Sequence, residues 1–188
     1  FPTEENPITI YLDEGTYSPS TNGESFPIEM IANVNFIGQG EELTILDAEF
    51  TSRVINIDNV ENISLSHLMI LSGNAEGYYW YEKYGGGIYI NNSSPIIEYV
   101  NFVENTSENA GGGIYLYNST GSYRNLHFTN NSGTHGGGIH IQESPGNSVT
   151  IFDSLFVDNN IARVGNGGGI DINYSSSATD NQPIVKVQ

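Results

Sequence analysis

The sequence contains no cysteine, only five lysine and arginine residues, and no uninterrupted apolar stretch of membrane-spanning length. Without cysteine the chain can form no disulfide and no thiolate or zinc–cysteine site. Without about 20 consecutive apolar residues it offers no transmembrane helix. The first residues, FPTEENP, contain neither an initiator methionine nor a signal-peptide pattern. We therefore expect a chain that has been processed, or that is part of a longer one.

The scarcity of basic residues makes the chain strongly acidic. Its 22 acidic residues give a formal net charge of −17. A charge of this sign repels phosphate backbones, so the sequence predicts no nucleic-acid binding. It also repels anionic membranes and uronic-acid polymers, unless a divalent cation bridges the two.

Two motifs recur in step along the chain. GGGI occurs at 85–88, 111–114, 136–139 and 167–170, at intervals of 26, 25 and 31 residues. Between these copies lie VNFVEN (100–105), LHFTNN (126–131) and LFVDNN (155–160). Recurrence at a fixed period is the signature of a repeat architecture, in which each repeat is one structural unit.

Each repeat predicts short strands separated by turns, because apolar residues alternate and glycine or asparagine interrupts every helical pattern. Strands repeating about every 25 residues match the coils of a parallel β-solenoid. An antiparallel sandwich of hairpins is the rival fold, but it does not explain why the same residue types return in every coil. We predict one all-β solenoid domain over 1–188, with opening coils that lack GGG (1–60) followed by GGGI and F-x-x-N coils (61–188).

The repeated glycines and asparagines are expected to form structural ladders between coils. Glycines supply corners with positive φ and allow close backbone approach, and asparagines tolerate left-handed backbone and pass hydrogen bonds between coils. The ladder residues are Gly86, Gly112, Gly137 and Gly168 together with Asn105, Asn131 and Asn160.

These features resemble a known superfamily. The whole chain is similar to a right-handed parallel β-helix of the pectate-lyase-like superfamily. Its opening, GTYSPSTNGESFPIEM followed by NVNFIGQGEELTILDA, resembles an uncharacterised β-helix domain of secreted bacterial proteins, and the GGGI and F-x-x-N units resemble polymorphic outer-membrane adhesin repeats. The resemblance implies an extracellular or cell-surface location. Because this superfamily contains lyases, hydrolases, adhesins and scaffolds, the site must be argued separately.

Strand alternation predicts which side chains follow the GGGI isoleucines on the outer face. One outward column contains Tyr89, Tyr115, His140 and Asp171, and a parallel column contains Asn91, Tyr117, Gln142 and Asn173. This strip could bind sugars, since tyrosine faces stack on pyranose rings, and His140 with Asp171 could pair as a base and its orienting group. Alternatively, it is a ladder in which like residues stabilise the sheet.

Catalysis has little support in the sequence. The resemblance implies an arginine or lysine base beside calcium-binding carboxylates for lyases, and clustered aspartates for hydrolases. Here Arg124 and Arg163 occupy non-equivalent places, and Asp153, Asp158 and Asp171 are scattered. We therefore predict a non-enzyme and assign no catalytic residue. We also predict no cofactor; calcium is the one candidate metal, because outward carboxylates and amide carbonyls suit a hard cation.

An aromatic insertion precedes the first GGGI motif. GYYWYEKY supplies Tyr78, Tyr79, Trp80, Tyr81 and Tyr84, and an insertion in a solenoid projects from one face. The loop is expected either to be a contact surface or to fold over a flank of the solenoid.

The leading hypothesis is therefore a secreted or cell-surface structural or adhesive solenoid that contacts like subunits or other surface proteins. The chain opens and closes on strand patterns, so it is either a fragment or a subunit that stacks end to end into an extracellular fibre. The alternatives are a carbohydrate-binding module and a polysaccharide lyase or hydrolase, each using the outward strip.

Overall fold

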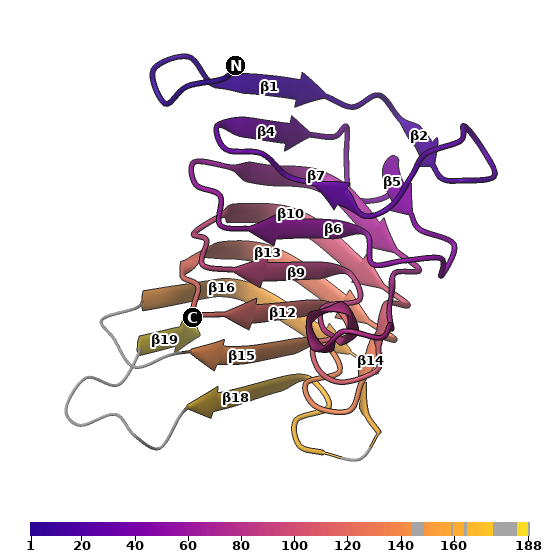
Figure 1. Cartoon of the computed structure of the whole chain (residues 1–188), viewed down its shortest axis with the longest axis vertical. Coiled ribbons are helices and arrows are strands. Elements are labelled where there is room, and N and C mark those ends of the chain that lie inside the picture. The colour runs from indigo at the N-terminus through magenta and orange to yellow at the C-terminus, as the bar shows by residue number, and fades with distance from the viewer. Residues whose placement is uncertain (144–148, 159, 164, 175–183, 188) are drawn as a thin grey trace.

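The computed structural model describes residues 1–188 except 144–148, 159, 164, 175–183 and 188. It is an all-β parallel solenoid of about 5 turns, which lie about 28 residues apart. Figure 1 shows the strands stacked from the N-terminal coil downward. The predicted solenoid is confirmed, and the antiparallel sandwich is excluded because every strand pair of the described residues is parallel.

The described residues form three sheets that run along the stack. The nine-stranded sheet contains β1 (Ile8–Tyr11), β2 (Gly15–Tyr17), β4 (Val34–Ile37), β5 (Thr44–Asp47), β7 (Ser64–Leu71), β10 (Ile96–Val103), β13 (Gly121–Thr129), β16 (Val149–Asp158) and β19 (Ile184–Val187). The six-stranded sheet contains β3 (Ile28–Glu29), β6 (Ile55–Asp58), β9 (Ile88–Asn91), β12 (Ile114–Tyr117), β15 (Ile139–Glu143) and β18 (Ile170–Tyr174). The four-stranded sheet contains β8 (Asn74–Ala75), β11 (Thr106–Ser107), β14 (Ser132–Gly133) and β17 (Ile161–Ala162).

The core is built from equivalent positions of successive coils. Ile88 pairs with Ile114, and Ile114 with Ile139, and all three side chains are 0% exposed. In the nine-stranded sheet the ring of Phe102 stacks on that of Phe128 with centroids 4.6 Å apart. Strands about 4.8 Å apart bring like residues into contact, so the sequence period alone generates the packing. The side chains of Leu155 and Val157, in the last F-x-x-N copy, lie outside the described set.

The glycine motif acts in two ways. Gly85 has φ +66, and its equivalents in the three later GGGI copies are also left-handed. At Gly86, a Cβ atom would collide with the backbone carbonyl oxygens of Thr106 and Gly112. The first glycine of each motif therefore turns the corner, and the second allows neighbouring coils to touch.

The asparagine ladder forms, although in one respect differently from the prediction. Oδ1 of Asn131 accepts hydrogen bonds from the backbone N–H and from Nδ2 of Asn105, at 3.0 and 2.9 Å. Oδ1 of Asn160 accepts the same pair from Asn131, both at 3.0 Å. Left-handed backbone occurs one residue earlier, at Glu104 and Asn130, and not at Asn105 or Asn131. The ladder side chains thus satisfy buried polar groups at a corner that their predecessors turn.

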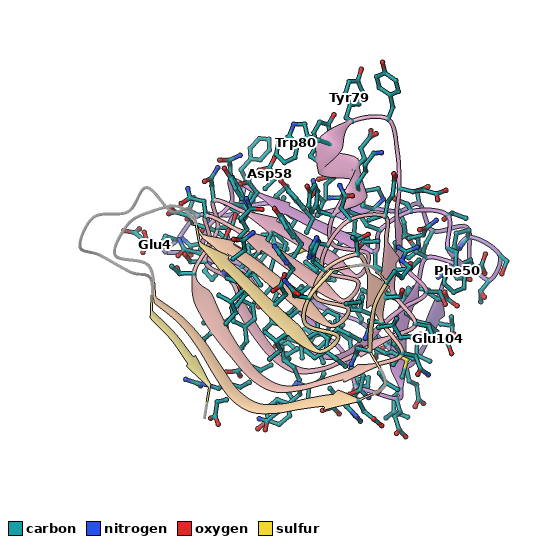
Figure 2. All side chains as sticks on the ribbon, turned by 90° about the horizontal axis from the view of Figure 1, so that it is seen from below. Glu4, Phe50, Asp58, Tyr79, Trp80 and Glu104 are labelled. Atoms are coloured by element: carbon teal, nitrogen blue, oxygen red, sulfur yellow. The ribbon has the colours of Figure 1, made fainter. Side chains whose placement is uncertain are left out.

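The one helical element of the described residues is the 3₁₀ helix η1 (Trp80–Lys83), which lies in the aromatic insertion. No helix among the described residues is long and apolar enough to cross a membrane. Figure 2 views the solenoid from below and shows Tyr79 and Trp80 projecting beyond the sheets.

Candidate functional site

The outer face of the six-stranded sheet carries one continuous column of side chains. As expected, Tyr89, Tyr115, His140 and Asp171 occupy equivalent positions on β9, β12, β15 and β18. The register extends this column upward through Asn56 on β6 and Glu29 on β3. The column therefore spans the six strands of this sheet and joins the GGGI repeats to the opening coils.

The rings of the column stack on one another. The centroids of Tyr89 and Tyr115 are 5.7 Å apart with an interplanar angle of 12°. Tyr115 and His140 are 5.4 Å apart at 5°. The ring of Tyr84 covers Tyr115 from outside, with centroids 4.4 Å apart. In-register parallel strands hold planar rings close to stacking distance, so the repeat itself builds this ladder.

Stacking leaves little of these rings accessible. Tyr89 is 4% exposed, Tyr115 1% and His140 4%. Burial raises the pKa of Tyr89 to about 12, assisted by the negative charge of Asp58, and burial also raises the pKa of Tyr115. Tyr115 lies between neighbouring rings, and the Tyr89 ring contacts Tyr115 and the guanidinium of Arg53, which is the arrangement of a structural ladder.

The parallel column links its neighbours by hydrogen bonds. Nδ2 of Asn91 donates to Oδ1 of Asp58 at 2.7 Å, and the hydroxyl of Tyr115 donates to Oε1 of Gln142 at 2.7 Å. Tyr117 is half-buried beside the ring ladder and packs against it, whereas Asn173 is exposed. Polar groups of the two columns therefore fasten adjacent coils together.

His140 and Asp171 are brought together, as their spacing suggested. Nδ1 of His140 lies 3.1 Å from Oδ2 of Asp171, and Nδ1 of His135 lies 3.7 Å from the same oxygen. The Nδ1 atom of His140 is buried and finds no well-directed hydrogen bond among the described residues. Burial lowers the pKa of His140, against the opposing effect of Asp171. The imidazole is therefore held preferentially neutral.

The aromatic loop, 77–84, presents its side chains to solvent. Tyr78 is 91% exposed, Tyr79 56%, Trp80 59% and Tyr81 44%. Tyr84 alone turns back onto the ring ladder. The four exposed rings contact one another: Tyr79 stacks on Tyr81, and Trp80 meets Tyr81 edge to face. An exposed aromatic cluster of this size is uncommon on a protein surface.

Polar contacts fix the base of this loop. Oε2 of Glu82 accepts a hydrogen bond from the backbone N–H of Tyr79 at 2.8 Å. Lys83 pairs with Glu108 on the next coil at 2.8 Å. Nη2 of Arg53 donates to the carbonyl of Tyr81 at 2.6 Å. The loop is thus a shaped projection that is tied to the solenoid at Tyr81 and Lys83, with the rings of Tyr78, Tyr79, Trp80 and Tyr81 exposed.

Arg53 is almost fully buried, which is unusual for an arginine. It is 8% exposed, and its guanidinium lies 4.8 Å from the centroid of the Tyr89 ring. It forms no ion pair with any described residue; burial lowers its pKa, while Tyr89, Glu29 and Glu82 act in the opposite direction. An arginine this buried is held by its carbonyl and ring contacts.

A cavity of about 520 Å³ opens between the aromatic loop and the outer face of the six-stranded sheet. Trp80 and Tyr81 form its aromatic wall, and Arg53, Asn56 and Tyr89 belong to its floor and side. Its acidic lining residues are Glu29, Asp58, Glu76 and Glu82. A second, smaller cavity of about 290 Å³ lies beside Tyr84, His135 and His140.

Sequence reasoning missed the floor of the larger cavity. Glu29, Arg53, Asn56 and Asp58 lie in the opening coils, where GGGI is absent and the register of the columns could not be assigned. The available signal was VINID (54–58), whose alternation matches that of the strand after GGGI and places Asn56 beside Tyr89. Of the predicted contact residues, Trp80, Tyr81 and Tyr89 line this cavity.

No group of three or more histidine, aspartate or glutamate side chains among the described residues is arranged to hold a metal ion. Two carboxylates of the larger cavity accept hydrogen bonds from neighbouring side-chain amides, Glu29 from Nδ2 of Asn56 and Asp58 from Nδ2 of Asn91, both at 2.7 Å. Amide donors therefore use part of the acceptor capacity that a calcium ion would require.

Comparisons with protein-family models, with curated proteins and with solved structures found no match for this chain. Its class is accordingly defined by its architecture, a parallel β-solenoid with an aromatic loop and an adjoining cavity on one face.

Proposed function

We propose that this chain is a non-enzymatic secreted or cell-surface module, whose β-solenoid is a rigid support and whose aromatic loop is an adhesive contact surface. The observation that carries the proposal is the exposure of Tyr78, Tyr79, Trp80 and Tyr81 on an anchored projection. Aromatic side chains with few rotatable bonds lose little entropy when they are covered, and they dominate many contact surfaces. The resemblance to the pectate-lyase-like superfamily and to adhesin repeats supports the same function and the extracellular location.

The partner this proposal favours is another copy of the chain. We expect sedimentation velocity to show self-association that rises with concentration, at an ionic strength high enough to screen the net charge of −17. Replacing Tyr78, Tyr79 and Trp80 together by serine should abolish it. The matched control is Tyr99→Asn, which removes an exposed tyrosine of β10 at a left-handed position that asparagine tolerates. Self-association that survives the triple substitution would refute the adhesive role of the loop.

The second candidate is a carbohydrate-binding module, favoured by the cavity beneath Trp80. The ring ladder that the sequence suggested for this role is covered, whereas the cavity combines an accessible indole with carboxylates and amides. An apolar wall with a few directed polar groups is the usual composition of a small-molecule site. Carbohydrate binding is thus proposed at a different place on the same face.

A further inference from the structure

We infer that the cavity lined by Trp80, Arg53, Asn56 and Asp58 binds a polyhydroxylated ring that carries no negative charge, and selects against acidic sugars. This inference deepens the carbohydrate-binding candidate above and does not depend on self-association. The occupant is named by its chemistry: a neutral or ammonium-bearing pyranose unit of an oligosaccharide.

The aromatic wall provides the apolar contact. The face of a pyranose ring carries C–H groups, which pack on an aromatic ring, and Trp80 remains 59% exposed at the rim of the cavity. Tyr81 contacts Trp80 edge to face at 5.9 Å and is itself tied to Arg53 through its carbonyl. The indole is therefore supported from behind and accessible in front. Figure 2 shows Trp80 and Asp58 on the same side of the molecule, and both line the cavity.

The floor supplies hydrogen-bond acceptors in fixed positions. The Oδ1 atoms of Asn56 and Asn91 are buried and have no hydrogen-bond partner among the described residues, although both residues line the cavity. The Nδ2 atoms of the same side chains are engaged, by Glu29 and Asp58 respectively, at 2.7 Å. These hydrogen bonds fix the orientation of both amides. The buried Oδ1 atoms are out of reach of a ligand, but the carboxylates of Glu29 and Asp58 are exposed, line the cavity and keep acceptor sites beyond these amide bonds, so hydroxyl groups of a ligand can donate to them.

The charge of the lining decides which sugars fit. Glu29, Asp58, Glu76 and Glu82 contribute four negative charges, and Arg53 contributes one positive charge. Arg53 is already committed to the Tyr81 carbonyl and the Tyr89 ring, so it is poorly placed to neutralise a bound carboxylate. A uronate would meet a net negative field, whereas a neutral sugar avoids this repulsion and an ammonium group is attracted.

The position of Trp80 makes the test direct, because it is the only tryptophan in the chain. Dilute protein is titrated with three probes of matched length: chitotetraose (neutral), its deacetylated tetramer (cationic) and tetragalacturonate (anionic). We expect the emission of Trp80 to shift to shorter wavelength with the first two probes. At low ionic strength we expect binding of the anionic probe to be at least about tenfold weaker, since one factor of ten corresponds to a modest electrostatic difference.

Two substitutions separate stacking from charge. Trp80→Ala, followed by calorimetry because it removes the fluorophore, should weaken binding of the neutral probe at least about tenfold. Asp58→Asn keeps the side-chain shape and removes one charge. It should therefore reduce the difference in affinity between the neutral and the anionic probe about threefold or more. Tyr99→Asn is the control, since Tyr99 lies on β10 and does not line the cavity.

The outcomes overturn different statements. If the anionic probe binds as tightly as the neutral one, or if Trp80→Ala leaves the affinity unchanged, the inferred site is wrong. If none of the three probes changes the emission of Trp80 or releases heat, carbohydrate binding at this cavity is refuted. Self-association through the aromatic loop stands or falls separately, because the sedimentation experiment contains no sugar.

Discussion

The side-chain amide of Asn105 donates to the amide oxygen of Asn131 across 2.9 Å, although 26 residues separate the two in the chain. Both side chains are 0% exposed. The same oxygen also accepts the backbone N–H of Asn105, and Nδ2 of Asn131 donates to the carbonyl of Phe102 at 2.9 Å. One side chain thus satisfies several buried polar groups of the coil above.

Replacing Asn131 by alanine should therefore be strongly destabilising. The substitution leaves the buried N–H of Asn105 without its partner and takes a side-chain donor away from the buried carbonyl of Phe102. Each such group costs about 1–3 kcal/mol, so we expect the free energy of unfolding to fall by roughly 2–5 kcal/mol. Chemical denaturation followed by circular dichroism measures this change.

The matched control is Asn130→Gly. Asn130 is exposed and left-handed at φ 58, a conformation that glycine adopts freely. We expect this variant to stay within about 1 kcal/mol of the wild type. Equal effects at the two positions would contradict a specific role for the ladder.

The second glycine of a GGGI motif offers a steric test. A methyl group on Gly86 would meet backbone carbonyls of the next coil, which cannot move aside without shifting a strand. We expect Gly86→Ala either to lower the free energy of unfolding by more than about 3 kcal/mol, which exceeds the usual cost of overpacking a core, or to prevent folding. Gly23→Ala is the comparison: its Cβ would meet nothing within 4 Å, and only the strain of φ +78 remains, about 1 kcal/mol. Thermal unfolding of both variants distinguishes a coil contact from a general intolerance of alanine.

The fold and the candidate site can be predicted from the sequence only where the repeat motifs can be recognised. GGGI and F-x-x-N carry their own register, so the ring ladder from Tyr89 to Asp171 could be assigned residue by residue. The opening coils have no such marker, and successive coils differ in length: Asn35 pairs with Ser64, 29 residues later, but Ser64 pairs with Ile96, 32 residues later. Without the register, the approach of Arg53 to the aromatic loop could not be predicted. The burial of the ring ladder could not be predicted either, because the alternation of apolar and polar residues does not show that Tyr84 folds back over Tyr115.

Tyr115 tests whether the ring ladder is structural. The ring is 1% exposed and lies between Tyr89, Tyr84 and His140. We expect Tyr115→Ala to lower the free energy of unfolding by about 3–5 kcal/mol, the usual cost of deleting a buried aromatic ring. Tyr115→Phe removes only the hydrogen bond to Gln142 and should cost about 1 kcal/mol. If both variants unfold like the wild type, the column does not stabilise the solenoid.

The pH dependence of stability should show the burial of His140. Its native pKa lies below the ordinary value of 6.5, so the unfolded chain binds the proton more readily. The free energy of unfolding therefore falls as the pH drops through about 6.5, until the native imidazole also becomes protonated. His140→Phe keeps a ring against Tyr115 but cannot titrate. We expect the stability of the wild type, relative to this variant, to decrease between pH 8 and pH 5 in denaturation curves. If the stability of the wild type and that of His140→Phe changed in the same way with pH, the native state would tolerate a charged His140.

Anchoring of the aromatic loop by Arg53 can be measured by proteolysis. Arg53→Met keeps much of the side-chain volume but removes the hydrogen bond to the Tyr81 carbonyl and the cation over Tyr89. A hydrogen bond from a charged donor contributes about 1.5–3 kcal/mol, so local opening of the loop should become at least about tenfold more frequent.

Trypsin can cut the loop only after Lys83, whose carbonyl and ammonium are held by Asn109 and Glu108. We expect cleavage there to accelerate by a similar factor when opening is fast compared with cutting. Arg124→Met, which removes an exposed arginine paired with Glu98, should leave the rate at Lys83 unchanged. Equal rates in all three proteins would mean that the loop is held by its own contacts and not by the arginine beneath it.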